Sequence, residues 1–265
     1  MTGRERSARV RPVVKRVVPA QARRALRTYV RPVWPPVGLA RFGSLRRLTP
    51  LGREFWDRGE PIDRYYIERF LRQQAGQDDY VTGDVRGRVL EIGDTYYAVT
   101  IGGWGHERSA ITALDVLSPD SAASQATIRG DLTDLPQVAD DTFDCIICTQ
   151  TLLLIYDVRA AIATMHRILK PGGVVLATVP GISPLCRPDA SLWGDFWRFT
   201  SRSAERLFAE AFGAAGVTVE SYGNVLSTTA FLHRMGVAEL KQAELDLRDP
   251  DFELIIGVRA IKQAG

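Results

Sequence analysis

Several apolar runs in this sequence end on a side chain that can bind a polar ligand. The segment from Arg88 to Gly93 reads Arg-Val-Leu-Glu-Ile-Gly, so an acidic residue and a glycine close a strand-like run. About twenty residues later Asp115 closes a second run, where a carboxylate can accept hydrogen bonds from both hydroxyls of a ribose. A glycine at the first strand end lets the backbone approach a ligand closely. The spacing therefore favours a site for a nucleoside.

The segments around these residues must form a sheet whose strand ends meet at one edge. Apolar runs alternate with helical patterns, which favours an α/β fold: a doubly wound, mainly parallel, seven-stranded sheet. Ligands of such sheets bind at the carboxyl ends of the strands. We predict strands at 88–92, 111–115, 126–129, 143–149, 174–179, 217–222 and 252–261. Helices are predicted at 63–71, at 158–169 with Asp157 as N-cap, and from 200 to about 212.

A turn motif completes the pattern. The segment 168–173 reads Ile-Leu-Lys-Pro-Gly-Gly and precedes the apolar run 174–179, which indicates helix end, tight turn and buried strand. With the 88–93 segment and Gly130-Asp131, this order resembles a class I S-adenosylmethionine-dependent methyltransferase, type 11-like, over about residues 85–262. A nicotinamide dehydrogenase would need Gly-x-Gly-x-x-Gly, which does not follow Ile92. The resemblance implies a Rossmann-like methyltransferase fold with S-adenosylmethionine as cofactor.

The resemblance also implies roles for individual residues. Those it assigns to the cofactor are Glu91, Gly93, Asp115, Asp131, Leu132 and Thr149. Glu91, just inside the turn after the first strand, helps to fix the cofactor's amino-acid end, and Gly93 lets the backbone approach the cofactor. Asp115, on the second strand, binds the ribose hydroxyls. The Asp-Leu pair contacts adenine, and the threonine lies below the methylsulfonium.

The first motif departs from the family pattern. Relatives read acidic-x-Gly-x-Gly-x-Gly, whereas here Gly93 is followed by Asp94-Thr95-Tyr96-Tyr97. The next segment combines β-branched residues with three glycines, so we expect the usual first helix to be short or replaced by a loop. A rebuilt loop can still accept S-adenosylmethionine, which carries no phosphate. The alternative is a blocked pocket, which would leave a non-catalytic binding or scaffold protein.

A catalytic base is not evident in this sequence. The segment 152–157 after the fourth strand reads Leu-Leu-Leu-Ile-Tyr-Asp and offers none. His106, in the loop after the first strand, is the one histidine we would test as a base, against the alternative of an exposed loop residue. No cluster with the spacing of a metal site is present.

Aromatic residues suggest where an acceptor binds. Trp193 and Trp197 flank a carboxylate and precede Arg198, and such rings can stack on a sugar or an aromatic acceptor. Tyr65, in the helix before the first strand, can also reach a ligand. Ring packing and an ion pair between Asp195 and Arg198 are the structural alternatives. We expect methyl transfer, at oxygen, to a small-molecule or glycan-like acceptor.

Charge is distributed unevenly along the chain. Residues 1–50 hold 13 Lys and Arg residues against Glu5 alone, although the net charge of the whole chain is only +3. We predict a basic, flexible extension at 1–47, a helical cap segment at 48–84 and a methyltransferase-like domain at 85–265. Residues 1–45 suit an anionic membrane surface or an acidic protein; nucleic acid is not expected, since no base-reading module accompanies the charge.

The composition indicates the cellular location expected for the protein. No apolar run approaches the ~20 residues of a membrane span. The three cysteines are too few for a disulfide framework, and Cys145 and Cys148 lie within an apolar strand, where core packing is expected. We therefore expect a bacterial cytoplasmic protein, able to bind peripherally at the inner membrane surface.

Overall fold

The computed structural model describes residues 43–76, 83–119 and 124–264. The chain divides into two compact units, Met1–Leu48 and Thr49–Gly265. The described part of the first unit contains one 3-10 turn, η1 (Gly43–Leu45). The predicted partner-binding segment 1–45 lies almost wholly outside the described residues. Nearly all of the predicted cap segment 48–84 belongs to the second unit, together with the sheet.

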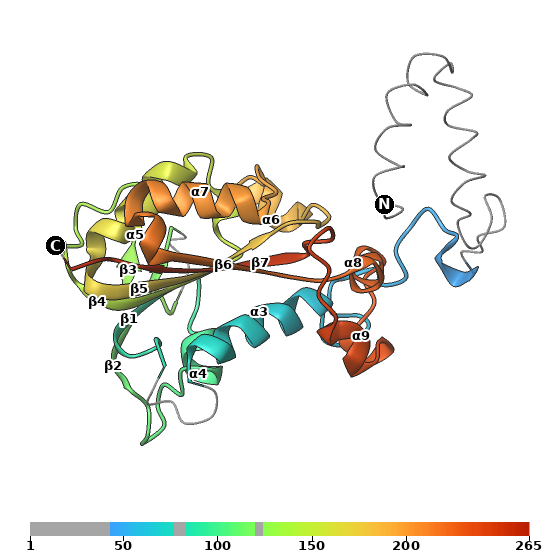
Figure 1. Ribbon diagram of the computed structural model, residues 1–265, viewed down its shortest axis with the longest axis horizontal. Helices are drawn as coiled ribbons and strands as arrows, with labels where there is room; N and C mark the ends of the chain where they lie inside the picture. The colour runs from blue at the N-terminus through green and yellow to red at the C-terminus, as the bar shows by residue number, and fades with distance from the viewer. Residues whose placement is uncertain (1–42, 77–82, 120–123, 265) are drawn as a thin grey trace, which may run out of the picture. The chain divides into compact units, whose positions relative to one another are not determined.

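A seven-stranded sheet forms the centre of the second unit (Figure 1). The strands are β1 (Gly87–Ile92), β2 (Ile111–Ser118), β3 (Ile128–Arg129), β4 (Phe143–Thr149), β5 (Leu169–Pro180), β6 (Val217–Tyr222) and β7 (Ile255–Ile261). Their order is β3-β2-β1-β4-β5-β7-β6, and only β7 is antiparallel to its neighbours. The predicted fold class is confirmed. The winding reverses between β1 and β4, where ligands bind in such sheets.

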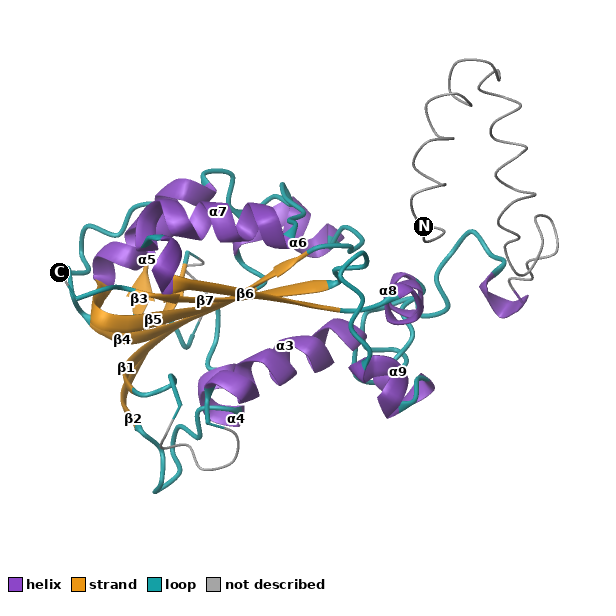
Figure 2. Ribbon diagram, viewed as in Figure 1, coloured by secondary structure: helices purple, strands orange, loops and turns teal. Residues whose placement is uncertain are grey.

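Helices cover both faces of the sheet (Figure 2). One face carries α5 (Val158–Ile168), α6 (Arg187–Leu192) and α7 (Ser201–Phe212); the other carries α3 (Ile62–Gln74) and α4 (Tyr96–Thr100). Beyond the end of the sheet lie α8 (Val225–Leu232) and α9 (Gln242–Asp246). Short 3-10 turns occur at η2 (Leu152–Leu154), η3 (Ala214–Gly216) and η4 (Val237–Glu239). The two covered faces explain why the central strands are apolar throughout.

Each face of the sheet has its own hydrophobic core. Ile162 and Met165 of α5 pack in one core, as their helical spacing predicts, and Ile67 and Phe70 of α3 pack in the other. Cys145 and Cys148, three residues apart on β4, are both buried free thiols on opposite faces. This arrangement confirms the prediction of core packing, because thiols on opposite faces cannot bind one metal ion.

The turn after α5 differs in detail from the prediction. Asp157 caps the helix as expected, its carboxylate accepting from the Ala160 N–H at 3.0 Å. The chain then enters β5 directly at Leu169, five residues earlier than predicted. The Lys-Pro-Gly-Gly segment forms a bulge within this strand, where Gly172 has φ of 78° and donates to the Lys262 carbonyl at 2.7 Å. The Lys-Pro-Gly-Gly motif is therefore part of β5 and does not precede the strand.

Candidate cofactor and acceptor site

The turn after β1 is organised by Glu91. Its two carboxylate oxygens accept hydrogen bonds from the N–H groups of Tyr97 and Ala98 at 2.8 and 2.7 Å. These N–H groups lie in the first turn of α4, where backbone N–H groups have no partner within the helix. Burial raises the pKa of Glu91 to about 7, although the two backbone donors act in the opposite direction. Glu91 thus holds the rebuilt turn in place, and α4, only five residues long, confirms the predicted short first helix.

Gly93 leaves open space at the end of β1. Its φ of 99° is accessible in practice only to glycine. No heavy atom of the described chain, its own neighbours apart, lies within 4 Å of the position that a Cβ would occupy. The Gly93 N–H donates to the Leu117 carbonyl of β2 at 2.9 Å, which fixes the turn against the sheet.

Tyr96 and Tyr97, which replace the small residues of the family motif, turn toward α3. The Tyr97 hydroxyl accepts from Nη1 of Arg64 at 2.6 Å, and the residue is 2% exposed. Burial raises the pKa of Tyr97 to about 12, against the opposing charge of Arg64. The Tyr96 hydroxyl donates to Glu68 at 3.1 Å, and its ring remains partly exposed. Both rings are thus committed to contacts with α3.

Arg64 is a site residue that the sequence analysis missed. Its Nε is buried without a hydrogen-bond partner among the described residues. Burial lowers the pKa of Arg64, but the nearby Tyr97, Asp63 and Asp94 outweigh it and raise the pKa. A charged guanidinium with an unused donor, beside the turn that ends β1, can bind an anionic group. Arg64, Glu68 and Arg72 are spaced by four residues and so share one face of α3, but this spacing alone does not show that the face meets α4.

Asp115 does not end β2, since the strand continues for three residues to Ser118. Its carboxylate accepts from Arg88 Nε and from the Thr127 hydroxyl, both at 2.8 Å. The prediction that Asp115 lies at the ligand-binding edge is therefore wrong. The apolar run extends past it as Val116-Leu117, and the ion pair with Arg88 explains how a carboxylate is accommodated inside a strand.

Buried Ser118 is the last residue of β2. It follows Leu117, whose carbonyl binds the Gly93 N–H, so it lies close to the end of β1. The next carboxylate in the sequence, Asp120, lies outside the described residues.

Asp131 and Leu132 follow the short strand β3. Asp131 Oδ1 accepts from the N–H and the hydroxyl of Thr133 at 2.8 and 2.9 Å, which leaves Oδ2 without a hydrogen bond among the described residues. Its exposed carboxylate is thus available to a ligand, and its role with adenine stays a prediction. Leu132 is buried in the core shared with α5 and α7, so its side chain cannot offer the open face that was predicted to contact the ring.

Thr149 ends β4, as predicted, and is half-buried. The next residue, Gln150, has φ of 48°, which is uncommon for a residue other than glycine. Its N–H donates to the Thr178 carbonyl at 2.9 Å and its side-chain amide to the Thr178 hydroxyl at 3.3 Å. Strained backbone of this kind concentrates at binding sites. Gln150 had no sequence signal, because glutamine does not mark a left-handed position.

Arg198 forms a clamp beyond the end of β5. Nη1 and Nη2 bind the two oxygens of Asp195 at 2.5 and 3.1 Å, and the Asp195 side chain is 1% exposed. Arg198 also donates to the carbonyls of Ser183, Pro184 and Trp197. The hydrogen bonds from Arg198 lower the pKa of Asp195. The guanidinium is fully used within the protein, so the structural alternative holds, and the predicted substrate contact of Arg198 is not supported.

Aromatic rings project from this clamp. The rings of Tyr156 and Trp197 lie 5.8 Å apart at 31°, and Phe196 meets Tyr156 edge-on at 5.5 Å. The indole N–H of Trp197 donates to the Ile155 carbonyl at 3.0 Å, which fixes the ring, yet all three residues are exposed. Trp193, at the end of α6, is exposed as well. Tyr156 and Phe196 were missed by the sequence analysis, although both lie beside predicted residues.

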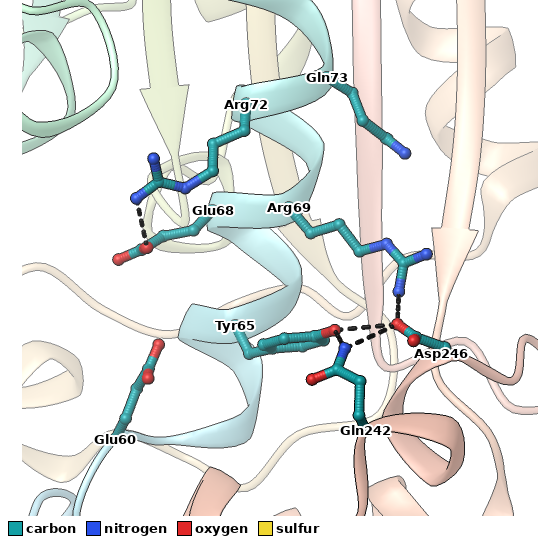
Figure 3. Close-up of a pocket in the computed structure, with 8 residues that line it drawn as sticks. All are labelled: Glu60, Tyr65, Glu68, Arg69, Arg72, Gln73, Gln242 and Asp246. Atoms are coloured by element: carbon teal, nitrogen blue, oxygen red, sulfur yellow. Dashed lines mark hydrogen bonds and ion pairs between the residues drawn. The ribbon is translucent and has the colours of Figure 1, made fainter. Parts of the chain in front are cut away.

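Tyr65 occupies a different region. Its hydroxyl bonds to Asp246 at 2.9 Å and to Gln242, on the side of α3 that faces α9 (Figure 3). The residues drawn in Figure 3 line a cavity of about 430 Å³, in which Arg69 pairs with Asp246 and Arg72 with Glu68. Helix α6, which ends beside Trp193, lies on the opposite face of the sheet from α3 (Figure 1). The structure therefore does not bring Tyr65 together with the other predicted acceptor residues.

His106 lies in the turn that leads into β2. Its N–H donates to the Gly103 carbonyl, and Nδ1 accepts from the Arg108 N–H at 3.3 Å. Ile111 begins β2 only five residues later, at the amino end of the strand. Because the site lies at the carboxyl ends, the structure does not bring His106 to it. The described residues also contain no group of three His, Cys, Asp or Glu side chains that could hold a metal ion.

A family model matches the middle of the chain. Residues 104–177 match a family model described as a methyltransferase domain. The match runs from the turn before β2 into β5 and leaves out the unusual segment after β1. A search of curated protein sequences finds no match. Within the described residues, no helix combines the length and apolarity needed to cross a bilayer.

Solved structures share the fold. Phosphoethanolamine N-methyltransferase 2 of Haemonchus contortus, in complex with S-adenosyl-L-methionine, is 14% identical with a TM-score of 0.50, over 77% of this chain and 54% of that one. A methyltransferase from Archaeoglobus fulgidus is 11% identical with a TM-score of 0.48, over 77% and 96%. The N-methyltransferase NodS of Bradyrhizobium japonicum, in complex with S-adenosyl-l-homocysteine, is 16% identical with a TM-score of 0.46, over 77% and 89%.

The arrangement of the sheet agrees with these findings. Five parallel strands are followed by an antiparallel hairpin in which β7 inserts between β5 and β6. Helices cover both faces (Figure 1). The sheet order is that of the predicted class I methyltransferase-like fold, and the family model of a methyltransferase domain matches the part of the chain from residue 104 to residue 177.

Proposed function

We propose that this protein binds S-adenosylmethionine at the carboxyl ends of β1 and β4 and transfers its methyl group to an oxygen of a small-molecule or glycan-like acceptor. The observation that carries the proposal is Gly93. Its left-handed backbone and the open space beside it are the one part of the family's glycine motif that this chain keeps. A side chain there would enter the volume that the cofactor needs.

The groups around Gly93 suit the cofactor chemically. S-adenosylmethionine carries a carboxylate at its amino-acid end and an amino group on adenine. The guanidinium of Arg64, beside the turn that ends β1, supplies positive charge suited to the carboxylate, and the unbonded oxygen of Asp131 is an acceptor suited to the amino group. Glu91 contributes indirectly, because it orders the turn whose backbone would face the ligand.

The acceptor would be held by the rings beyond β4 and β5. When bound, S-adenosylmethionine supplies an electrophilic methyl group on a good leaving group, so much of the rate comes from holding the acceptor in line. The exposed rings of Tyr156, Trp197 and Trp193 suit the apolar face of a sugar or an aromatic ring. The acceptor atoms that a sugar offers are hydroxyl oxygens, which favours methylation at oxygen.

A matched pair of glycine substitutions tests the cofactor site. Gly59 has φ of 90° and open surroundings, like Gly93, but lies in the loop before α3. Gly93→Ala should weaken binding of S-adenosylmethionine and S-adenosylhomocysteine in calorimetry by about tenfold or more, equivalent to 1.4 kcal/mol. Gly59→Ala imposes similar backbone strain and should leave the affinity unchanged. Equal affinities in the two variants would move the cofactor site elsewhere.

The competing function is a non-catalytic binding or scaffold protein. The observation in its favour is that Tyr96 and Tyr97 occupy positions at which relatives carry small residues. Calorimetry on the unmodified protein decides between the two functions: absence of binding at millimolar ligand would favour the scaffold.

If the cofactor binds, transfer of a labelled methyl group to a panel of sugars and phenols tests the acceptor class. Trp197→Ala should then raise KM for the acceptor without changing cofactor affinity.

We also propose a bacterial cytoplasmic setting. The prevalence of arginine over lysine suits a GC-rich bacterial genome, and the three cysteines are free thiols. Fractionation of the source cells, with thiol labelling of Cys186 as the exposed cysteine, would test it.

A further inference from the structure

Helix α8 is apolar on its exposed side as well as on its buried side. Ala230 and Phe231 pack in the core of the α3 face, beside the buried hydroxyl residues Ser227 and Thr228. Val225, Leu226 and Leu232 are nevertheless 55%, 45% and 40% exposed. Surface helices normally present polar residues to solvent. The exposed apolar side chains therefore need a reason outside the core.

The orientation of α8 is fixed by its first residue rather than left loose. The Asn224 side-chain oxygen accepts from the N–H groups of Leu226 and Ser227, both at 2.9 Å. Its amide nitrogen donates to the carbonyl of Glu244 in the middle of α9 and to that of Leu247 immediately after the helix, at 2.7 and 2.8 Å. This buried residue caps α8 and anchors it to its neighbour, so the helix cannot rotate to hide its leucines without losing four hydrogen bonds.

Two further aromatic residues lie beside the C-terminal end of α8. The Leu51 N–H donates to the His233 carbonyl at 2.9 Å, so the segment that precedes α3 runs along this end of the helix (Figure 1). Phe55 meets the ring of Phe231 edge-on at 6.1 Å, and the adjoining Trp56 is 58% exposed. We call Phe55, Trp56, Val225, Leu226 and Leu232 the α8 surface.

Aliphatic and aromatic side chains of this kind insert at the boundary between lipid headgroups and acyl chains. The charged side chains of the segment 53–58, together with Arg234 and Glu239 beyond the C-terminal end of α8, are three arginines and three acids (Arg53, Arg58, Arg234, Glu54, Asp57 and Glu239). Arg58 pairs with Glu239, so this part of the surface offers little net charge to an anionic bilayer. Attraction to a bilayer has to come from elsewhere in the chain.

The sequence that leads into the α8 surface supplies that attraction. The first 50 residues hold 13 basic residues against one acid, and they join the folded unit at Thr49, immediately before this surface. A basic segment and an apolar insertion together give the two signals that stable membrane attachment requires. A second copy of the chain could cover the apolar side chains, but two equally basic segments would then repel each other.

We propose that the α8 surface inserts into the interface of an anionic bilayer. This inference goes beyond the proposed methyl transfer and does not depend on it. It assigns the apolar contact to named residues of the folded unit and leaves the electrostatic attraction to the basic segment.

Vesicle binding of the full chain tests the proposal. The protein should co-sediment with vesicles of phosphatidylcholine and phosphatidylglycerol at 7:3, and the triple variant W56S/L226S/L232S should bind about tenfold or more weakly, because three apolar insertions are lost. Leu192→Ser, a leucine 71% exposed on α6, is the matched control and should bind like the parent. Equal binding by all three proteins would overturn the proposal, as would a parent that does not bind.

A second measurement locates the contact directly and does not depend on a triple variant. Brominated phosphatidylcholine quenches tryptophan that lies within the bilayer, and Trp56→Phe should abolish most of the quenching seen in the parent. Trp104→Phe, at a partly exposed tryptophan in the loop after α4, should leave the quenching unchanged. Quenching that survives Trp56→Phe would overturn the proposal. So would a dimer in sedimentation velocity that the triple variant converts to a monomer without any change in vesicle binding.

Discussion

The two sides of the candidate site are built in opposite ways. On the α3 side, Glu91, Arg64 and Tyr97 are buried or half-buried and joined by short hydrogen bonds that run from β1 through α4 to α3. On the α6 side, the clamp between Asp195 and Arg198 is equally firm, but it carries exposed aromatic rings above it. The polar groups on the α3 side thus bond mainly to one another, whereas the aromatic rings on the α6 side are exposed and are not covered by any described part of the chain.

The difference suits two kinds of ligand. A cofactor is the same molecule in every turnover, so a fixed frame lowers the cost of binding it. An acceptor is held by shape and stacking, for which rings on a rigid support are suited. The contrast also separates stability from binding: substitutions on the α3 side and in the clamp should cost stability, and substitutions of the exposed rings should not.

The largest effect is expected from breaking the clamp. Arg198→Ala leaves the Asp195 carboxylate buried without its partner and should lower the free energy of unfolding at pH 7 by about 3 kcal/mol, measured by urea denaturation. Arg198 holds the pKa of Asp195 below its usual value, so the contribution is present above the carboxyl range and is lost as the pH falls through the lowered pKa.

A matched control for the clamp lies four residues further along the chain. Arg202→Ala removes a partner of Glu205 from an exposed pair with a 3.7 Å separation and should change stability by less than about 0.5 kcal/mol. If Arg198→Ala cost no more than this control, the clamp would not be the rigid support that the comparison assumes.

The next effect concerns the pH dependence of the α3 side. Burial raises the pKa of Glu91 to about 7, so between about pH 4.5 and 7 the folded state binds a proton that the unfolded state releases. Stability should therefore fall as the pH rises through this window, by about 3 kcal/mol. Glu91→Gln should remove this component, and the difference between the two denaturation curves isolates it from Asp63, whose pKa burial also raises, to about 6. Parallel curves would mean that the backbone donors keep Glu91 ionised throughout.

A smaller effect is expected where α4 joins α3. Tyr97→Phe removes the hydroxyl that accepts from Arg64 and leaves a second buried guanidinium donor unpaired. We expect a loss of about 1 to 2 kcal/mol in unfolding free energy. Tyr96→Phe, which affects a partly exposed hydroxyl bonded to Glu68, should cost less than about 0.5 kcal/mol. Similar values for both would show that Tyr97 is no more tightly integrated than its neighbour.

The sequence predicted the sheet better than it predicted the site. Apolar runs and the Asp157 cap sufficed for the fold class and the approximate positions of the strands, because burial on two faces leaves a strong signal. Asp115 was misassigned because a carboxylate within a strand and one at its end look alike when the partner, Arg88, is 27 residues away. Arg64 and Gln150 were missed for a related reason: a contact between helices and a left-handed backbone are tertiary properties that residue type alone does not encode.

The smallest effect on stability should come from the rings of the α6 side, where Tyr156 is 72% exposed. Tyr156→Ala removes its contacts with Phe196 and Trp197 but no buried surface of the core, so the unfolding free energy should change by less than about 0.5 kcal/mol. Phe199→Ala, two residues beyond Trp197 and buried in the core, should cost about 3 to 5 kcal/mol and serves as the contrast. A large loss in Tyr156→Ala would show that the rings brace the fold, and the separation between frame and acceptor surface would then fail. A small loss leaves binding as the reason for exposing three aromatic rings at the strand ends.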